Sequence, residues 1–419
     1  MNLPSSLKAL QYYNFRLYFS GQAISLIGTW MQRIAVSWLV YNITHSAFML
    51  GLVAFAGSIP VLLLSPYAGA FVDRHSRYRT LLVTQIASMI QAGLFTLVVF
   101  TGYYNITVII SLSVMLGIIN AFDTPSRQSF MIVLVKDKAV LPNAIALNSS
   151  MVTLARLLGP AAAGIILTAY GQDICFLVNF ISFFAVIASL LAMKIKVPVR
   201  KKNEEPIWKG LQEGYRYLHN HSGLRAAILL MAITSLVVIP YSNLFPVYAQ
   251  DILKGDVSTF SWLNSISGLG ALMGAIYMAN RPLGTNLLKL IAFSGLLFTI
   301  SLTAFSYTTK LPLSLAFIMT GEAGMLTQIA ATNTYVQTNV DEHMRGRVVS
   351  YYVMAFQGMQ PIGSLIIGGL AHITSAPFTV LAEGLAGIAA ILFFIPVLKK
   401  ARKEADAKRE HDMKMLQER

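Results

Sequence analysis

Residues 69–79 read GAFVDRHSRYR, a short charged stretch between two apolar runs near Ala47–Tyr67 and Leu81–Phe100. Each run has about the 20 residues that a helix needs to cross the hydrocarbon core of a bilayer. The arginines of the stretch are costly in hydrocarbon but favourable beside the anionic lipids of the cytoplasmic leaflet. The stretch is therefore predicted to be a cytoplasmic loop between two membrane helices.

The composition of the whole chain fits a membrane protein. Its 419 residues are 55% hydrophobic and only 12% charged, half of the roughly 25% charged share of soluble domains. This is too little charge to coat a soluble core, which argues against a soluble enzyme, a disordered chain and a coiled coil. A net charge of +14 would suggest nucleic acid in a soluble protein. Here the charges lie between apolar runs, so we expect the lipid bilayer as partner and no nucleic acid.

Working outward from the first pair of runs gives twelve candidate spans. They lie near Leu17–Val40, Ala47–Tyr67, Leu81–Phe100, Ile106–Phe122, Ala144–Tyr170, Cys175–Met193, Ala226–Tyr248, Phe260–Ala279, Leu287–Phe305, Leu311–Val336, Val348–Ile373 and Phe378–Leu398. The sequence predicts an all-α membrane protein with twelve transmembrane helices.

The placement of Lys and Arg predicts the orientation. If the N-terminus is cytoplasmic, Lys254 and Lys310 are the only Lys or Arg residues in outer loops. Arg33 and Arg156 fall inside spans, and all the others lie in segments expected inside. Because positive charge marks the cytoplasmic side, both termini are predicted to be cytoplasmic.

The chain divides into two halves of six spans. We expect an N-terminal bundle at 1–193, a cytoplasmic linker at 194–225, a C-terminal bundle at 226–398 and a cytoplasmic tail at 399–419. A weak internal repeat places Pro160 of the fifth span opposite Pro361 of the eleventh. The linker contains a short amphipathic segment, Trp208–Leu218, which is expected to lie on anionic lipid or, as the alternative, to bind a partner.

The 69–79 stretch resembles the signature G-x-x-x-D-R/K-x-G-R-x-R/K of the major facilitator superfamily. Gly69, Asp73, Arg74, Arg77 and Arg79 match it, while Ser76 stands where glycine is usual. Gly69 would let a neighbouring helix approach closely, and Asp73 can pair with a cation or cap a helix start.

Further stretches resemble one branch of that superfamily, which contains the enterobactin exporter and macrolide efflux proteins. They are residues 21–41 (GQAISLIGTWMQRIAVSWLVY), 121–135 (AFDTPSRQSFMIVLV), 143–164 (NAIALNSSMVTLARLLGPAAAG) and 344–352 (MRGRVVSYY). The resemblance implies a monomeric, multi-pass transporter of the bacterial cytoplasmic (inner) membrane. It would export a siderophore, a macrolide or another drug-like molecule by proton antiport with alternating access.

The fifth span is similar to the G-P-x-x-G motif of antiporters, here with three residues between Pro160 and Gly164 after Gly159. Proline bends a helix, and glycine permits close helix contacts. An ordinary kinked packing helix is the alternative.

Charges inside spans are the best site candidates, because each is expensive there unless it is paired or hydrated. Arg156 and Glu322 lie near the middle of the fifth and tenth spans, and Arg33 lies in the outer third of the first. Arg33 could instead extend to the outer headgroups. Glu383, near the outer end of the last span, is expected to be structural. If the arginines face the cavity, an anionic or zwitterionic cargo is favoured; if Arg33 extends away, an apolar drug fits equally well.

The resemblance implies that helices one, four, seven and ten line a cavity, so Glu322 and Arg33 would face it. The polar candidates nearby are Gln22, Gln32, Asn120, Tyr241, Asn243 and Gln328. Pro240 and Pro246 are expected to interrupt the outer half of the seventh span, as an outer gate or as a passive kink.

Two hypotheses concern mechanism. First, Asp73 pairs with Arg127 and faces the start of the eleventh helix near Arg347–Ser350, as a latch on the cytoplasmic side. Second, Glu322 carries the coupling proton, since it and Glu383 are the only carboxylates within the spans.

Other classes of function are less well supported by the sequence. An uptake carrier or a lipid or lysophospholipid flippase on the same fold is the alternative, and a receptor or channel is a third reading. No P-loop pattern and no catalytic constellation occurs in the sequence, and the chain has one cysteine, Cys175, and no paired histidine motif. We therefore expect no enzyme activity, no cofactor and no metal site.

Overall fold

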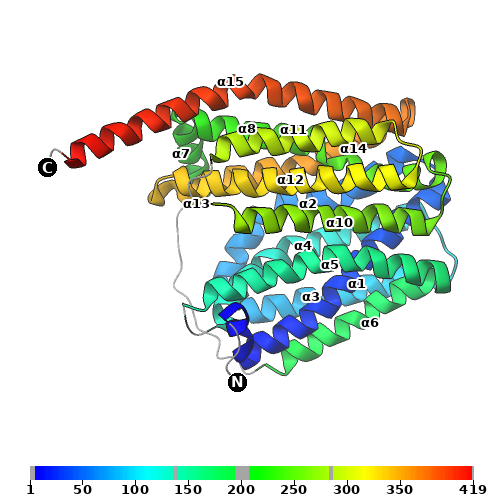
Figure 1. The fold of residues 1–419 in the computed structure, drawn as a ribbon. Coiled ribbons are helices and arrows are strands. Elements are labelled where there is room, and N and C mark those ends of the chain that lie inside the picture. Colours follow the sequence, from blue (N-terminus) through cyan, green and yellow to red (C-terminus); the bar gives the residue numbers. More distant parts are fainter. Residues whose placement is uncertain (1–4, 136, 138, 194–206, 283–285, 418–419) are drawn as a thin grey trace. The chain divides into compact units, whose positions relative to one another are not determined.

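The computed structural model describes residues 5–135, 137, 139–193, 207–282 and 286–417 (Figure 1). The side chains of residues 5, 6, 66, 70, 73, 207–211 and 401–417 lie outside this description. The described residues form helices and connecting turns, without a strand. They make two compact units, Met1–Glu204 with Asn243–Gly268 (unit 1) and Glu205–Ser242 with Leu269–Arg419 (unit 2).

Eleven helical segments of the described chain are long and apolar enough to cross a membrane. The predicted eighth span corresponds to α10 (Val257–Asn280), which has 24 residues but is not among the eleven. Serine and asparagine dilute its hydropathy, since Ser261, Asn264, Ser265 and Ser267 all lie within it. The count of twelve, the cytoplasmic termini and the predicted domain boundaries therefore stay predictions. Residues 194–206 of the predicted linker lie outside the described residues.

Unit 1 is a bundle of long helices. Its elements are η1 (Ser5–Gln11), α1 (Tyr13–Thr44), α2 (Ala47–Arg74), α3 (Arg77–Phe100), α4 (Ile106–Leu134), α5 (Leu141–Tyr170) and α6 (Gln172–Leu191), with α9, η3 and the first half of α10. Side chains that accept a backbone N–H fix three helix starts: Ser46 for α2, Ser76 for α3 and Asn105 for α4. Helix α1 packs against α5 and α6, and α2 packs against α4.

Unit 2 is a second bundle. Its elements are α7 (Ile207–Asn220), α8 (Ser222–Val237), the second half of α10, α11 (Leu287–Ser306), α12 (Leu311–Asn339), η4 (Glu342–Met344), α13 (Arg345–Val353), the π-helix η5 (Met354–Gly358), α14 (Met359–Ile373) and α15 (Ala376–Gln417). Helix α11 packs against α12 and α15, and α8 packs against α14 and α15. Helix α15 continues without a break from the last predicted span through the predicted tail to Gln417 (Figure 1).

The seventh span is broken where its prolines predict. Helix α8 ends at Val237 and is followed by the 3-10 helix η2 (Ile239–Leu244), the single turn α9 (Phe245–Val247) and the π-helix η3 (Tyr248–Ile252). Pro240 and Pro246 lack the N–H groups that a continuous α-helix would use. The chain passes from unit 2 to unit 1 within this interrupted segment, between Ser242 and Asn243.

The amphipathic linker segment folds as α7 and packs against the α13 region of unit 2. Glu213 forms an ion pair with Arg347, and the Tyr217 hydroxyl donates to Asp341 Oδ2 at 3.0 Å. Partial burial is the main cause that raises the pKa of Tyr217. Leu218 is buried in a cluster with Val340, Met344 and Val348. One face of the helix is thus occupied by protein contacts, rather than being wholly available for the predicted lipid surface.

Candidate functional site

The exposed residues of α1 are of mixed character, whereas those of α3 are apolar after its first turn. The exposed positions along α1 are Tyr13, Arg16, Ser20, Ile24, Arg33 and Asn42. Those along α3 after its first turn are all large and apolar: Val83, Ile86, Ile90, Leu94, Leu97 and Phe100. Helices that face lipid expose apolar side chains, and charged positions in spans turn to water or protein. The α3 face therefore suits lipid.

Arg33 is exposed on a different side of α1 from Arg16 and Ser20. Its guanidinium stands over the Trp30 ring, with Cζ 4.9 Å from the ring centroid, a cation–π contact. Trp30 and Arg33 are three residues apart, so they share one helix face. The ring holds the guanidinium in a defined orientation while leaving its edge uncovered.

The fifth-span motif brings α5 against α1 at this point. A Cβ atom added to Gly159 would overlap Cβ of Trp30, so only glycine fits the crossing. Pro160 is buried beside it, and Gly164 faces Ser261 of α10 instead. The two glycines of the motif thus serve two different contacts of α5.

The two intramembrane arginines lie on either side of this crossing. Arg156 precedes Gly159 by three residues and is half-buried, while Arg33 follows Trp30 by three. Sequence reasoning named both arginines, and the structure places both in unit 1 within one turn of the α1–α5 contact.

Gln32 takes a different place from the one expected. It is 3% exposed and lies in a chain of amides inside unit 1. Asn179 Nδ2 donates to Gln32 Oε1 at 2.6 Å, and Gln32 Nε2 donates to Gln91 Oε1 at 3.1 Å. These bonds join α6, α1 and α3, so Gln32 holds helices together instead of lining an open route. Asn120, on α4, is half-buried.

In unit 2 the central feature is a buried acid. Glu322 on α12 is 1% exposed and Tyr241 of η2 is 2% exposed. The Tyr241 hydroxyl donates to Glu322 Oε1 at 2.9 Å. Gly270 of α10 passes directly beside Glu322, because a Cβ there would lie 2.9 Å from the Glu322 Cβ. Glu322 is therefore enclosed by protein in this conformation and does not line an open cavity, unlike the expectation from family resemblance.

The remaining predicted polar residues lie farther along these elements. Gln328, one and a half turns after Glu322, is 1% exposed, and its Nε2 donates to Thr234 Oγ1 of α8 at 3.3 Å. Asn243 is half-buried at the first position of the segment that joins unit 1. The structure therefore groups Tyr241, Glu322 and Gln328 in unit 2 around α8, η2 and α12.

Glu383 on α15 is a second buried acid of unit 2. It is 2% exposed, and neither carboxyl oxygen has a hydrogen-bond partner. The next residue, Gly384, packs against Thr303 of α11, so the two helices are in close contact here. An ionised carboxylate in such a place would carry a large desolvation cost.

Arg127, named for the cytoplasmic latch, pairs with Asp123 one helical turn earlier. Asp123 is 2% exposed and also accepts from Thr84 Oγ1 at 2.8 Å and from Gln85 Nε2 at 2.7 Å. Asp123 is thus a partner that sequence reasoning missed, although its i, i+4 spacing to Arg127 was a readable signal.

The other residues named for the latch lie in different surroundings. The Asp73 side chain lies outside the described residues, so the Asp73–Arg127 pairing stays a prediction. Arg74 is exposed, and Arg77 Nη1 donates to the Ser129 carbonyl at 3.0 Å. No described atom lies within 4 Å of a Cβ built on Gly69, so the expected close helix contact is absent there in this conformation.

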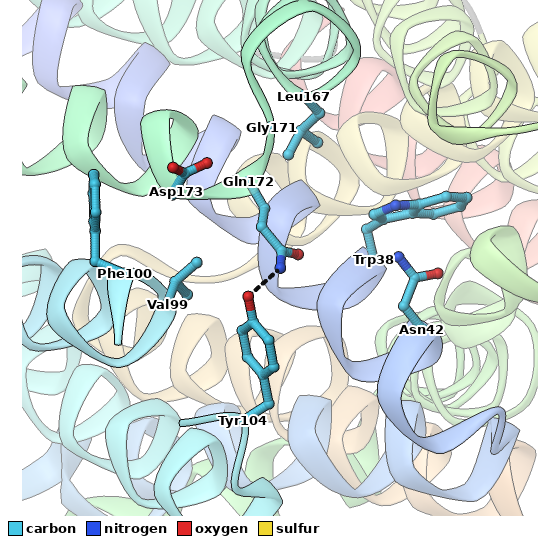
Figure 2. Close-up of a pocket in the computed structure, with 9 residues that line it drawn as sticks. All are labelled: Trp38, Asn42, Val99, Phe100, Tyr104, Leu167, Gly171, Gln172 and Asp173. Atoms are coloured by element: carbon cyan, nitrogen blue, oxygen red, sulfur yellow. Dashed lines mark hydrogen bonds between the residues drawn. The ribbon is translucent and has the colours of Figure 1, made fainter. Parts of the chain in front are cut away.

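At the end of unit 1 opposite the 69–79 loop lies a cavity of about 510 Å³ (Figure 2). It is lined by Trp38, Asn42, Val99, Phe100, Tyr104, Leu167, Gly171, Gln172 and Asp173. Gln172 Nε2 donates to the Tyr104 hydroxyl across it at 3.0 Å. None of the predicted site residues lines this cavity.

The Asn243–Gly268 segment is attached to the same end of unit 1. The Tyr41 hydroxyl donates to Asp251, and Gln250 Nε2 donates to Asn42 Oδ1 at 2.5 Å. Trp38 stacks on Phe260, with ring centroids 5.6 Å apart. Sequence reasoning expected a gate near the broken seventh span but did not name these residues.

Comparison with known proteins supports a transporter. The sequence pattern of the family described as transmembrane secretion effector matches residues 4–418. The staphyloferrin A transporter of Staphylococcus aureus is 27% identical over 92% of this chain and 97% of its own length. The multidrug efflux pump Tap of Mycolicibacterium fortuitum is 26% identical over 88% of this chain and 92% of its own length. A crystal structure of the nucleoside transporter NupG has the same fold, with a TM-score of 0.74 and 12% identity over 94% of this chain and 100% of that one.

Proposed function

Because the chain belongs to the transmembrane secretion effector family of major facilitator transporters, we propose that it exports a small organic molecule by proton antiport. The chain is a multi-pass bacterial membrane protein, and the relatives named above, a staphyloferrin A transporter and a multidrug efflux pump, align over nearly their whole length. We further propose twelve spans with cytoplasmic termini, a monomer in the cytoplasmic membrane and no catalytic activity. The cargo is a siderophore, a macrolide or another drug-like compound.

The observation that carries the coupling proposal is the buried Glu322–Tyr241 hydrogen bond. Tyr241 belongs to η2, the interrupted part of the seventh span, and Glu322 belongs to the continuous helix α12. Gain or loss of a proton at Glu322 changes the charge of the acceptor in this bond, and so changes how firmly η2 is attached to α12. Proton exchange at Glu322 is thereby linked to the conformation of the break.

Alternating access requires such a link between a proton and a movable element. The 3-10 and π-helical turns on either side of Pro246 lack the regular bonds of an α-helix, so this segment can rearrange with less loss of hydrogen bonding than a continuous span. Glu322 would therefore exchange its proton with one side of the membrane while η2 is attached, and with the other after η2 has moved.

The test is a flux assay with the purified protein in liposomes. A panel of siderophores, macrolides and dyes is first screened for compounds that accumulate in cells lacking the protein. Each such compound is then loaded into the liposomes, and a pH gradient of either sign is imposed across their membrane. We expect the compound to move uphill in the direction opposite to the proton flow. Movement of the compound in the same direction as the protons would indicate an uptake carrier instead. A flux that ignores the gradient would exclude antiport.

A further inference from the structure

We propose that the cavity of Figure 2 is a binding site for a primary organic ammonium ion, with the ammonium group at Asp173 and the organic group against Trp38 and Tyr104. The inference concerns binding at this end of unit 1, and it goes beyond the proposed function because it depends neither on the cargo nor on the direction of transport. It is carried by the size of the cavity, by an acid that makes no bond to the protein, and by the aromatic side chains around it.

The cavity has the size and the walls of a small-molecule site. Its volume of about 510 Å³ lies within the roughly 300–1,000 Å³ of ligand pockets in proteins. It is enclosed by the C-terminal parts of α1, α3 and α5, by the loop after α3 and by the first turn of α6. Val99 and Leu167 are buried, whereas Phe100 and Tyr104 are 53% and 43% exposed. The cavity thus has a packed inner wall and a rim that a ligand can reach.

Asp173 gives the cavity its charge. It makes no hydrogen bond or ion pair within the described part of the chain, and none of the described residues that line the cavity is Lys, Arg or His. The carboxylate lies beside Gly171, because a Cβ atom there would come within 2.9 Å of Asp173 Oδ1. An acid in the first turn of a helix is favourable by itself, so the ligand is indicated by what surrounds the carboxylate.

The surrounding groups suit an ammonium ion with an organic body. Trp38, Phe100 and Tyr104 present aromatic rings, and a cation near the face of such a ring is attracted to it. Gln172 uses its Nε2 to donate to the Tyr104 hydroxyl, so its Oε1 remains as an acceptor. A primary ammonium group has three N–H donors for such acceptors, and a quaternary one has none. An anion would meet a carboxylate here without a counter-charge.

Two sources could supply the ammonium group. One is a free amine in the water at this end of the protein, and the other is the ethanolamine headgroup of a phospholipid. Phe100 is the last of the exposed apolar residues along α3 and also lines the cavity. The site can therefore be reached from the lipid beside α3 as well as from water, and the experiment must separate the two sources.

The experiment measures binding to the purified full-length protein in nanodiscs of phosphatidylcholine. Three probes share a phenyl ring on a two-carbon chain: phenethylammonium is a cation, 2-phenylethanol is neutral and phenylacetate is an anion. A fourth, phenethyltrimethylammonium, keeps the charge but has no N–H donor. Dissociation constants are measured by saturation-transfer NMR, with empty nanodiscs to correct for partition into lipid.

The wild-type protein is expected to bind phenethylammonium at least tenfold more tightly than the alcohol, and at least threefold more tightly than the quaternary ion. Phenylacetate should not bind above the empty nanodiscs. Asp173→Asn should lower the affinity for phenethylammonium at least tenfold, because a charge-assisted hydrogen bond is lost. Asp256→Asn is the matched control, since Asp256 does not line the cavity and asparagine can still cap α10; it should bind as the wild type does.

A second variant decides if Asp173→Asn does not fold. Tyr104 lies in the loop after α3 and is partly exposed, so Tyr104→Leu is expected to fold. It keeps an apolar wall but removes the ring and the hydroxyl, and it should weaken phenethylammonium binding at least threefold.

The lipid composition identifies the source of the ammonium group. If the headgroup of phosphatidylethanolamine occupies the cavity, replacing half of the phosphatidylcholine with this lipid should weaken the apparent affinity of the wild type for phenethylammonium. An unchanged affinity would identify a free amine as the ligand.

Two results would overturn the inference. Equal binding of the cation, the alcohol and the anion by the wild type, or no binding above the empty nanodiscs, would exclude an ammonium site. Unchanged phenethylammonium affinity in both Asp173→Asn and Tyr104→Leu would exclude the cavity as its location. Neither result would bear on the proposed export function, which is tested by flux.

Discussion

The two units differ in both the sign and the depth of their intramembrane charges. Unit 1 carries Arg33, which is exposed, and Arg156, which is half-buried. Unit 2 carries Glu322 and Glu383, which are 1% and 2% exposed. An accessible cation is suited to meeting a large solute, whereas an enclosed acid can be reached only by something as small as a proton. We expect from this contrast that cargo binding and proton binding are divided between the units.

A similar contrast holds between two ion pairs, one in each unit. The Arg127–Asp123 pair of unit 1 has side chains that are 20% and 3% exposed, and Thr84 and Gln85 also bond to the aspartate. The Arg347–Glu213 pair of unit 2 has side chains that are 29% and 35% exposed. Buried pairs are expensive to break, while accessible pairs are worth little. The first pair is therefore a fixed part of its bundle, and the second can open and close.

The largest expected effect comes from removing the buried acid that is bonded to η2. Glu322→Gln keeps the shape of the side chain but cannot exchange a proton, so it should reduce pH-gradient-driven export to the level of protein-free liposomes while cargo binding survives. Glu383→Gln is the matched control, because Glu383 is equally buried but has no hydrogen-bond partner, and it should change transport little. Full uphill export by the Glu322 variant would show that Glu322 does not carry the coupling proton. Asp73 and Asp123 would then be the remaining candidates for that role.

The next effect is structural and concerns unit 1. Gly159→Ala adds a methyl group where Trp30 already fills the space, and overpacking of this kind costs typically about 1–3 kcal/mol. We therefore expect a lower melting temperature in detergent. Gly346→Ala in α13 is the control, since a Cβ there meets no described atom within 4 Å, and it should melt as the wild type does. Equal melting of the two variants would show that the crossing is looser than described.

The sequence was sufficient to predict the helices but not how each is rotated about its axis. Hydropathy placed the spans, and Pro240 with Pro246 placed the break in the seventh. Whether a residue such as Glu322 faces water or protein depends on the neighbours of α12, and the polar residues of α12 are not confined to one face. Gln32 was misplaced for the same reason, because an amide in a span can bond to another helix as readily as to water.

The same distinction holds for the candidate site, where the sequence indicates the residues but not their contacts. Arg33 and Arg156 could be selected from the sequence because a charge in a span always requires an explanation. The contact between Trp30 and Gly159 beside them could not, because it joins residues more than a hundred positions apart. The contacts of Asp251 with Tyr41 and of Glu213 with Arg347 were missed because both acids lie outside the spans, where carboxylates are common and carry no signal.

A smaller, conformational effect is expected from the proposed latch. We propose that Asp73 stabilises the outward-facing state through Arg127 and the start of the eleventh span near Arg347–Ser350. Asp73→Asn should then slow turnover a few-fold and increase labelling at the cytoplasmic side. The reporter is Ser350→Cys, an exposed position, in a Cys175→Ala background that removes the one native thiol. Unchanged labelling in the Asp73 variant would exclude the latch. The Asp123–Arg127 pair adds a requirement, because Arg127 must serve both acids or exchange between them.

The smallest effect is expected at the accessible pair of unit 2. Glu213→Gln removes the charge that α7 presents to Arg347, and partly exposed pairs are worth only about 0–1 kcal/mol. Stability should therefore change by less than the error of most melting experiments, since Leu218 and the Tyr217–Asp341 hydrogen bond still hold α7 in place.

Turnover is the more sensitive measurement. If α7 restrains the start of α13 during transport, Glu213→Gln should change the turnover rate up to about fivefold, which corresponds to 1 kcal/mol, and raising the salt concentration should reproduce this change in the wild type. Arg216→Gln, an exposed arginine on the same helix, is the control. A large loss of stability in the Glu213 variant would mean that this pair is as essential to its unit as Asp123–Arg127 is to the other, and that the contrast in depth between the two pairs carries no energetic meaning.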